Sequence, residues 1–184
     1  RPVLLQSWDA LRVTDLQLRQ DRVDAARADV VAIASIDAVR AGAVELRLWQ
    51  AAPDGKRSLA VQRHVDLQPG INRIELPVHI AHPQRWFPTG YGEQALYRFD
   101  LEAGGSKASA RTGLRSVELH RHTDANDAQG SSFHFVVNGI PVFAKGANTI
   151  PFDMFQPRVT RAQLHRVLQS APDANMTFTR SWGG

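Results

Sequence analysis

A short polar segment, Lys145–Asn148, interrupts an apolar stretch of the chain and contains a glycine. Polar side chains in a glycine-containing turn at the end of an apolar strand are candidates for a functional site, because loops on a rigid scaffold commonly carry binding and catalytic residues. Asn148 is the candidate here. A plain hairpin with an asparagine in the following turn explains the same pattern, and the pattern alone favours this structural interpretation.

Two histidines form a second candidate. His120 and His122 have the i, i+2 spacing that places two imidazoles on one face of a strand, with Asp124 two residues further on. Structural zinc usually takes four protein ligands and catalytic zinc takes three, and no other histidine lies nearby in the sequence. The pattern therefore favours solvent-exposed strand histidines, and we expect neither a metal nor a cofactor.

The residues before Lys145 predict the hairpin that positions Asn148. Phe133–Val137 has the two-residue periodicity of a strand. Asn138 and Gly139 form the strongest short hairpin signal, because a type I′ turn needs positive φ at both central residues. Pro141–Phe143 then supplies the returning strand.

Seven earlier stretches also have strand periodicity and are separated by turns. They cover residues 14–20, 29–37, 43–51, 59–67, 71–79, 96–102 and 114–120. Short strands separated at such regular intervals predict a mainly β fold, an antiparallel immunoglobulin-like β-sandwich of about seven strands over residues 14–121. We assign residues 1–13, with a short strand at Val3–Leu5, to the end of a preceding domain or a linker.

The character of the sequence changes after a polar, turn-rich segment, residues 122–132, which we interpret as a linker. Thr160 is a plausible helix N-cap, and Gln163 stands three residues later, as a capping box requires. A strand over Asn175–Ser181 follows. Strand, helix and strand form a βαβ unit, the building block of parallel sheets and barrels. One such unit cannot cover both faces of a sheet, so we expect the chain to be truncated at both ends.

Composition excludes some functions. The chain has a net charge of +4, but its cations are mostly scattered arginines that form no basic stripe, so we expect no nucleic-acid partner. No apolar run approaches the length of a membrane span, so we expect no membrane partner. The absence of cysteine excludes disulfides and thiolate metal sites.

Four motifs follow one another along the chain, at Arg1–Val3, Phe87–Tyr97, Gly146–Asp153 and Arg180–Gly184. Together they resemble the β-mannosidase branch of the family 2 glycoside hydrolases. That branch has an Arg-Pro-Val start, a Trp-Pro-x-Gly-Tyr-Gly-Glu-Gln loop, a Gly-Ala-Asn-Trp-Ile-Pro loop and an Arg-x-Trp-Gly-Gly ending. The resemblance implies that an immunoglobulin-like domain leads into a catalytic (β/α)8 barrel, whose truncated N-terminal part is residues 133–184.

The resemblance also implies roles for three residues. Active sites of (β/α)8 barrels lie at the C-terminal ends of the strands. We expect Asn148 to follow the first barrel strand, and Arg180 and Trp182 to lie at the end of the second. By resemblance, Asn148 and Arg180 would donate hydrogen bonds to sugar hydroxyls, and Trp182 would be a platform or a support. The alternatives are a loop cap, an ion-pair partner and a core residue.

The chain departs from the family pattern at several positions. Thr149 stands where the family usually has tryptophan, and Phe87 and Thr89 replace the usual tryptophan and asparagine of their loop. Stacking on a sugar face needs an aromatic ring. The departure at Thr149 therefore predicts weaker sugar contact at that position, as in a divergent member with altered specificity.

Catalytic carboxylates are absent from the predicted barrel portion. Retaining glycosidases use two carboxyl groups roughly 5 Å apart, and the resemblance implies two glutamates late in the barrel. Every glutamate of this chain precedes residue 132, and only Asp153 and Asp173 are acidic after it. Asp173 sits at a helix end, where a turn role is expected. We therefore expect the chain to be inactive alone and its catalytic residues to lie beyond residue 184.

Two classes of function remain open at this stage. The first is a fragment of a β-mannosidase-like exo-glycosidase that acts on β-mannosides and packs against a preceding sugar-binding-like domain and the rest of its barrel. The second is a non-catalytic immunoglobulin-like module for carbohydrate binding or scaffolding. Another family 2 specificity, such as β-galactosidase or β-glucuronidase, is a variant of the first.

Overall fold

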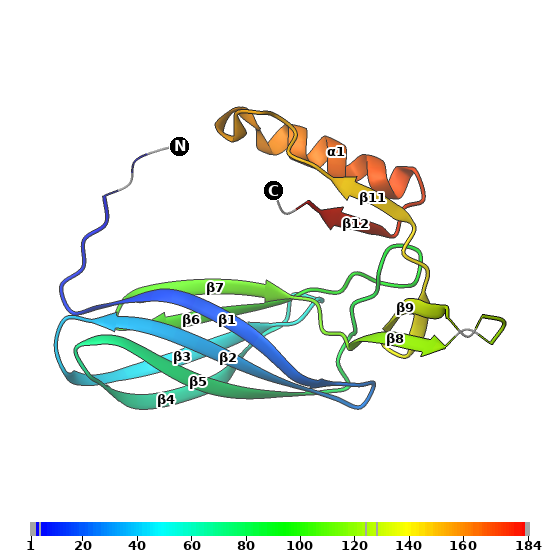
Figure 1. Ribbon diagram of the computed structural model, residues 1–184. Coiled ribbons are helices and arrows are strands. Elements are labelled where there is room, and N and C mark those ends of the chain that lie inside the picture. The colour runs from blue at the N-terminus through cyan, green and yellow to red at the C-terminus, as the bar shows by residue number, and fades with distance from the viewer. Residues whose placement is uncertain (1–2, 4, 124, 128, 183–184) are drawn as a thin grey trace. The chain divides into compact units, whose positions relative to one another are not determined.

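The computed structural model describes residues 3, 5–123, 125–127 and 129–182, which form two compact units (Figure 1). The first unit comprises residues 5–86 and Ala95–Arg115. The second comprises Val3, Phe87–Gln94 and the described residues from 116 to 182. Parts of the sequence predictions lie outside the described residues, namely Arg1, Pro2, Leu4, Asp124, Gly183 and Gly184.

The first unit is a sandwich of two antiparallel sheets, which confirms the predicted fold class (Figure 1). One sheet has the order β1-β2-β5, and the other has the order β4-β3-β6-β7. The strands are β1 (Leu11–Val23), β2 (Arg27–Ala38), β3 (Gly42–Ala51), β4 (Arg57–Leu67), β5 (Gly70–Ala81), β6 (Tyr97–Ala103) and β7 (Ser106–Thr112). Their inner faces enclose one apolar core, in which Ile36, Leu48 and Phe99 are fully buried.

The middle strand β2 is apolar on both faces, and the structure explains how both are covered. Val30, Ala32, Ala34 and Ile36 belong to the core between the sheets. Val31 and Ile33 are also buried, on the outer face, where residues of the flanking strands β1 and β5 lie opposite them. Arg19 of β1 and Glu75 of β5 form an ion pair at 3.1 Å, so long charged side chains bridge the middle strand.

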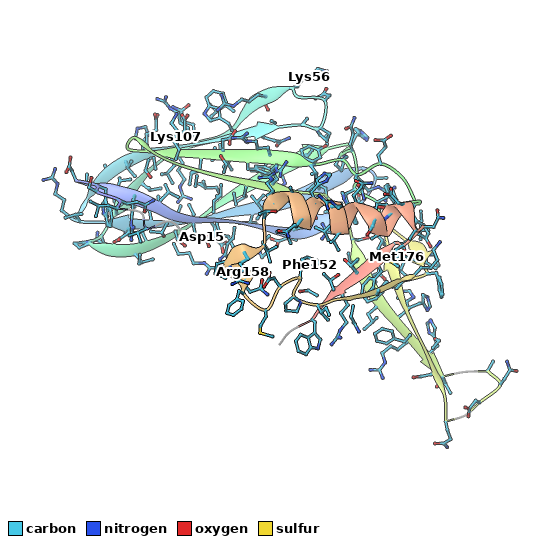
Figure 2. The ribbon with its side chains drawn as sticks, turned by 90° about the horizontal axis from the view of Figure 1, so that it is seen from above. Asp15, Lys56, Lys107, Phe152, Arg158 and Met176 are labelled. Atoms are coloured by element: carbon cyan, nitrogen blue, oxygen red, sulfur yellow. The ribbon has the colours of Figure 1, made fainter. Side chains whose placement is uncertain are left out.

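The cations of the sandwich are dispersed and mostly paired. Lys56 pairs with Asp54 at 3.1 Å and Lys107 with Glu102 at 3.0 Å, and Figure 2 shows the two lysines at separate ends of the unit. Hydrogen bonds from Arg19 to Asp21, and then to Glu75, raise the pKa of its guanidinium further. Such charge patterning is typical of a solvated surface.

The second unit carries two smaller sheets. Strands β8 (Val117–Thr123), β9 (Ser131–Val137) and β10 (Ile140–Val142) form an antiparallel sheet of order β10-β9-β8. Asn138 and Gly139 have φ of 52° and 80°, which confirms the predicted I′ hairpin. Strands β11 (Gly146–Thr149) and β12 (Phe178–Ser181) are parallel and are joined by the 3-10 turn η1 (Gln156–Arg158) and the helix α1 (Arg161–Asp173). Among the described residues, no helix has the length and apolarity to cross a membrane.

Three details of the predicted sandwich differ from the structure. Residues 114–120 were expected as its last strand, but β8 pairs with β9 in the other unit, and the seventh sandwich strand is β7. Residues 122–132 were expected as a linker, but they hold the β8–β9 connection and the adjoining ends of both strands. Val3 and Leu5 lie in no strand and are almost fully exposed. A two-residue period indicates that a strand exists but does not identify its neighbour.

Gly113 supports a close contact at the end of the sandwich. A Cβ atom at Gly113 would lie 2.5 Å from Cγ of Trp86, whose main-chain N–H donates to the Leu114 carbonyl at 2.8 Å. We expect Gly113→Ala to lower the free energy of unfolding by about 1–3 kcal/mol, because the tryptophan ring must move. Gly42→Ala is the matched control, since nothing lies within 4 Å of its Cβ position. Equal urea midpoints for the two variants would contradict this packing.

Asp24 makes the sandwich sensitive to acid. Its carboxylate accepts from the main-chain N–H groups of Arg27 and Ala26 and from the Arg22 guanidinium, at 2.7–2.9 Å. These hydrogen bonds, that from Arg27 first, lower the pKa of Asp24 to about 2. A lowered carboxyl pKa stabilises the fold above about pH 4, and this contribution is lost as the pH falls through the folded pKa.

We therefore expect Asp24→Asn, which keeps one acceptor oxygen and removes the charge, to be less stable than the unmodified chain at pH 6. The gap should close as the pH approaches 2. Urea unfolding at several pH values measures it, and a gap that is independent of pH would show that the charge of Asp24 is not the cause.

Candidate functional site

The parallel pair β11–β12 brings the predicted site residues together. Parallel strands need a long crossover connection, and here α1 supplies it. Thr160 and Gln163 form the capping box predicted from the sequence, which fixes the start of α1. The register places Gly146 opposite Phe178 and Asn148 opposite Arg180. A Cβ atom at Gly146 would lie 1.7 Å from the Phe178 carbonyl oxygen, so this close approach of the two backbones requires glycine.

Further contacts hold β12 in place. Thr177, just before β12, donates from its hydroxyl to the Phe143 carbonyl at 2.7 Å, and its main-chain N–H donates to the Lys145 carbonyl at 2.9 Å. The Phe178 ring stacks on Phe135 of β9, with ring centroids 5.9 Å apart. The β9–β10 hairpin therefore packs against the parallel pair. These contacts lie at the start of β12 and fix its register there.

Asn148 and Arg180 contact each other directly. Arg180 Nη1 donates to Asn148 Oδ1 at 3.1 Å, and both side chains are exposed. Because a guanidinium has donors only, the amide oxygen of Asn148 must face it. Asn148 can then offer a ligand its NH2 group and one remaining lone pair of Oδ1, and Arg180 can offer its remaining N–H groups. The pair presents hydrogen-bond donors and suits a ligand rich in acceptor oxygens.

The pair lies on the face of β11–β12 opposite α1. Alternate residues of a strand point to opposite faces, and Thr149, Thr179 and Ser181 line a hollow of about 420 Å³ together with Leu164 and Leu168 of α1. Figure 1 shows α1 running alongside the two strands, and Figure 2 labels Phe152, which also lines the hollow. In a (β/α)8 barrel the helices surround the strands, so the face away from α1 is the one that would point inward.

Trp182 and Thr149 lie together at this hollow. The main-chain N–H of Trp182 donates to the Thr149 carbonyl at 3.0 Å, and both residues line the hollow. Trp182 therefore lies on the α1 side of the two strands, whereas Asn148 and Arg180 share the other face. The Thr149 position, where the family pattern has tryptophan, belongs to the α1 side.

One placement differs from the prediction. Asn148 was expected in a turn after the first barrel strand, which was taken to be the strand ending at Phe143. In the structure that strand is β10 of the antiparallel hairpin, and Asn148 lies inside the next strand, β11. Lys145–Asn148 has no apolar alternation, so local pattern could not identify it as a strand. Its pairing with β12, which follows much later in the sequence, makes it one.

The aromatic loop before β6 contributes a structural contact. The hydroxyl of Tyr91 accepts from the Phe143 main-chain N–H at 3.1 Å, and the Phe87 N–H donates to the Glu93 carbonyl at 2.8 Å. These bonds give Tyr91 and its loop a structural role within the second unit. The loop thereby holds the chain just after β10, from which β11 departs.

The two carboxylates after residue 132 have local structural partners. Asp153 Oδ1 accepts from the Phe155 main-chain N–H at 2.7 Å, and Asp173 Oδ1 accepts from the Gln169 side chain at 3.2 Å. Both bonds are short-range and belong to a turn and a helix end. Among the described residues after 132, the two carboxylates thus have local partners, and the hydrogen bond between Asn148 and Arg180 involves neither of them.

Comparison with curated proteins finds close relatives of this chain. It is 43% identical over 129 residues to "Beta-mannosidase" of Bos taurus, and the matched region covers 66% of this chain and 15% of that protein. It is 38% identical over 159 residues to "Beta-mannosidase" of Rattus norvegicus, covering 82% of this chain and 18% of that protein. The chain thus spans less than a fifth of the length of these relatives. No family model matches it.

A solved structure has the same fold over nearly the whole chain. The crystal structure of the β-D-mannosidase from Dictyoglomus thermophilum matches with a TM-score of 0.85 and 30% sequence identity. The match covers 97% of this chain and 22% of that one. Sandwich, hairpin and parallel pair therefore occur together in a structure whose sequence is also related.

Hydrogen exchange can measure the contribution of the Asn148–Arg180 contact, because exchange of a main-chain amide reports how readily the β11–β12 pair opens. We expect Asn148→Ala and Arg180→Ala each to speed hydrogen exchange of the Trp182 main-chain amide, whose partner is the Thr149 carbonyl. The double variant should lose less than the sum, with a coupling of about 0.5–1.5 kcal/mol. Additive effects would mean that the two side chains do not interact in solution.

Proposed function

We propose, from the premise that the chain is a β-mannosidase-like sequence of glycoside hydrolase family 2, that it forms part of a retaining exo-glycosidase acting on terminal β-D-mannose residues. The sandwich would be the immunoglobulin-like domain of that enzyme. The parallel pair with α1 would be the first βαβ unit of its catalytic barrel. Because the chain spans a small part of its relatives, the activity belongs to the longer protein.

The observation that carries the proposal is the Asn148–Arg180 pair, held by register on the strand face opposite α1. A terminal sugar presents hydroxyl oxygens that accept hydrogen bonds, and the pair offers mainly donors. A guanidinium bonded to a neutral amide keeps its full positive charge, which strengthens the hydrogen bonds it makes. We assign both residues to sugar binding at the subsite of the scissile bond.

Trp182 has a supporting role in this proposal. Its ring, 53% exposed in this chain, lines the hollow between β12 and α1 rather than the face of the donor pair. A wall on this side would hold the C-terminal end of β12 and so orient Arg180. Sugar stacking would then depend on aromatic residues from other strands.

The chemistry requires two further groups. A retaining mechanism uses one carboxyl group as nucleophile and one as acid and base, roughly 5 Å apart. Asp153 and Asp173 are engaged locally, so we assign both catalytic roles to glutamates outside residues 1–184. The donor pair would bind the sugar and position it between them, and the 184-residue chain would not hydrolyse glycosides alone.

Kinetics of the longer protein tests these roles. We expect Arg180→Ala and Asn148→Ala to lower kcat/KM for an aryl β-D-mannoside by roughly tenfold to a hundredfold, the effect of losing a hydrogen bond that involves a charged group. Arg161→Ala removes an exposed cation at the start of α1 and is the matched control. Unchanged kinetics in both site variants would refute the assignment.

Two further measurements address the proposal as a whole. Release of a different sugar in preference to mannose would redirect it to another family 2 specificity. Turnover by the 184-residue chain itself would overturn the assignment of the catalytic carboxylates to another part of the protein.

A further inference from the structure

Three histidines converge on one face of the β8–β9 hairpin. The register of the two strands places His134 directly opposite His120, and His122 lies two residues along the same face. The ring centroids are 5.7 Å apart for His120 and His122, 5.5 Å for His120 and His134, and 5.8 Å for His122 and His134. The nearly equal distances describe a triangle of imidazoles.

The ring nitrogens of the triangle lie slightly further apart than the ligand nitrogens of a bound zinc ion. One ring nitrogen from each histidine lies within 4.8 Å of the others. Zinc–nitrogen bonds of about 2.0–2.1 Å in a tetrahedral site place the ligand nitrogens roughly 3.4 Å apart. His122 is exposed and the other two are half-buried, so rotation about their side-chain bonds can bring the nitrogens inward without moving the strands.

We propose that His120, His122 and His134 form a three-imidazole binding site for a divalent transition-metal ion, with Zn²⁺ as the expected occupant. Three neutral imidazoles satisfy three positions of a tetrahedral ion and leave the fourth for water. Imidazole suits Zn²⁺, Cu²⁺ and Ni²⁺, whereas Ca²⁺ and Mg²⁺ need the oxygen ligands that this triangle does not offer.

Glu118 supplies an independent argument for the site. It lies two residues before His120 on the same face, and its Oε2 is 3.0 Å from Nε2 of His120. Metal-bound histidines commonly donate their second N–H to a carboxylate, which fixes the ring and the tautomer. A bond from Nε2 to Glu118 leaves Nδ1 of His120 free to bind the ion.

The surroundings of the triangle favour a cation. Besides the histidines, the described residues on this face of β8 and β9 are Glu118, Ser132 and Val136, and none is cationic. Arg121 lies between His120 and His122 in sequence and therefore points to the opposite face. A bound ion would tie β8 to β9 across the sheet, since His134 belongs to one strand and the other two ligands to its neighbour.

Calorimetry with Zn²⁺ alone, on chain purified without a histidine tag, tests the proposal. We expect one Zn²⁺ per chain. We expect His122→Ala and His134→Ala each to weaken the Zn²⁺ affinity by more than about tenfold, because losing a direct ligand costs at least as much as losing an outer-shell partner. Glu118→Gln should weaken it by about tenfold. His165→Ala, on α1, is the matched control and should bind as the unmodified chain does.

Two spectroscopic readouts accompany the titration. Co²⁺ in place of Zn²⁺ should give the intense visible absorption of a four-coordinate ion, and this should disappear in His134→Ala. Zn²⁺ should slow hydrogen exchange of the β8 and β9 amides in the unmodified chain but not in His122→Ala. Because His122 is exposed, this variant keeps the fold, and circular dichroism of the metal-free proteins verifies it.

The proposal is overturned if the unmodified chain binds no Zn²⁺ in the micromolar range. It is also overturned if His122→Ala and His134→Ala bind as tightly as the control. These outcomes concern β8 and β9 and leave the sugar-binding role of Asn148 and Arg180 unaffected.

Discussion

Strand register is the constraint on which the functional features of this chain depend. Side chains alternate between the two faces of a strand, so a shift by one residue would move every side chain to the other face. In β11–β12 the parallel register places Asn148 beside Arg180. In β8–β9 the antiparallel register places His134 opposite His120. Other residues fix each register. In β11–β12 it is the close approach of Gly146 to Phe178. In β8–β9 it is Asn138 of the Asn138–Gly139 turn, which bonds to Ser116 just before β8.

The turn residue Asn138 shows how local and distant constraints combine. Its positive φ serves the type I′ turn, while its Oδ1 accepts from the Ser116 main-chain N–H at 3.0 Å, just before β8 begins. One asparagine therefore closes the β9–β10 turn and aligns β8 alongside β9. Asn138→Gly would keep the turn and the main-chain bond from residue 138 to the Ser116 carbonyl at 3.1 Å. It would lose the side-chain bond to the Ser116 N–H, because glycine has no side-chain oxygen.

Local signals predicted most elements correctly, and pairing accounts for what they missed. The capping box at Thr160 and the hairpin turn at Asn138 involve neighbouring residues, so the sequence alone identifies them. Strand β7 has only serine, alanine, threonine and cations, and it was missed for lack of an apolar period. His134 was not counted with His120 because it is not near it in the sequence, and only the pairing of β8 with β9 brings the two together. Asn148 was identified as a site candidate, but its strand exists only through its distant partner β12.

In the proposed sugar-binding role, the Asn148–Arg180 pair supplies mainly hydrogen-bond donors, and other strands would complete the site. Barrel sites are assembled from the ends of several strands, so one βαβ unit contributes a fraction of the chemistry. A carboxylate in contact with Arg180 would have its pKa lowered and could not act as a general acid near neutral pH. Bonding Arg180 to the neutral amide of Asn148 keeps the guanidinium oriented without such a partner. In the proposed role, the charge would remain available for hydroxyl oxygens, and acid–base function would belong to carboxylates that other strands hold in less polar surroundings.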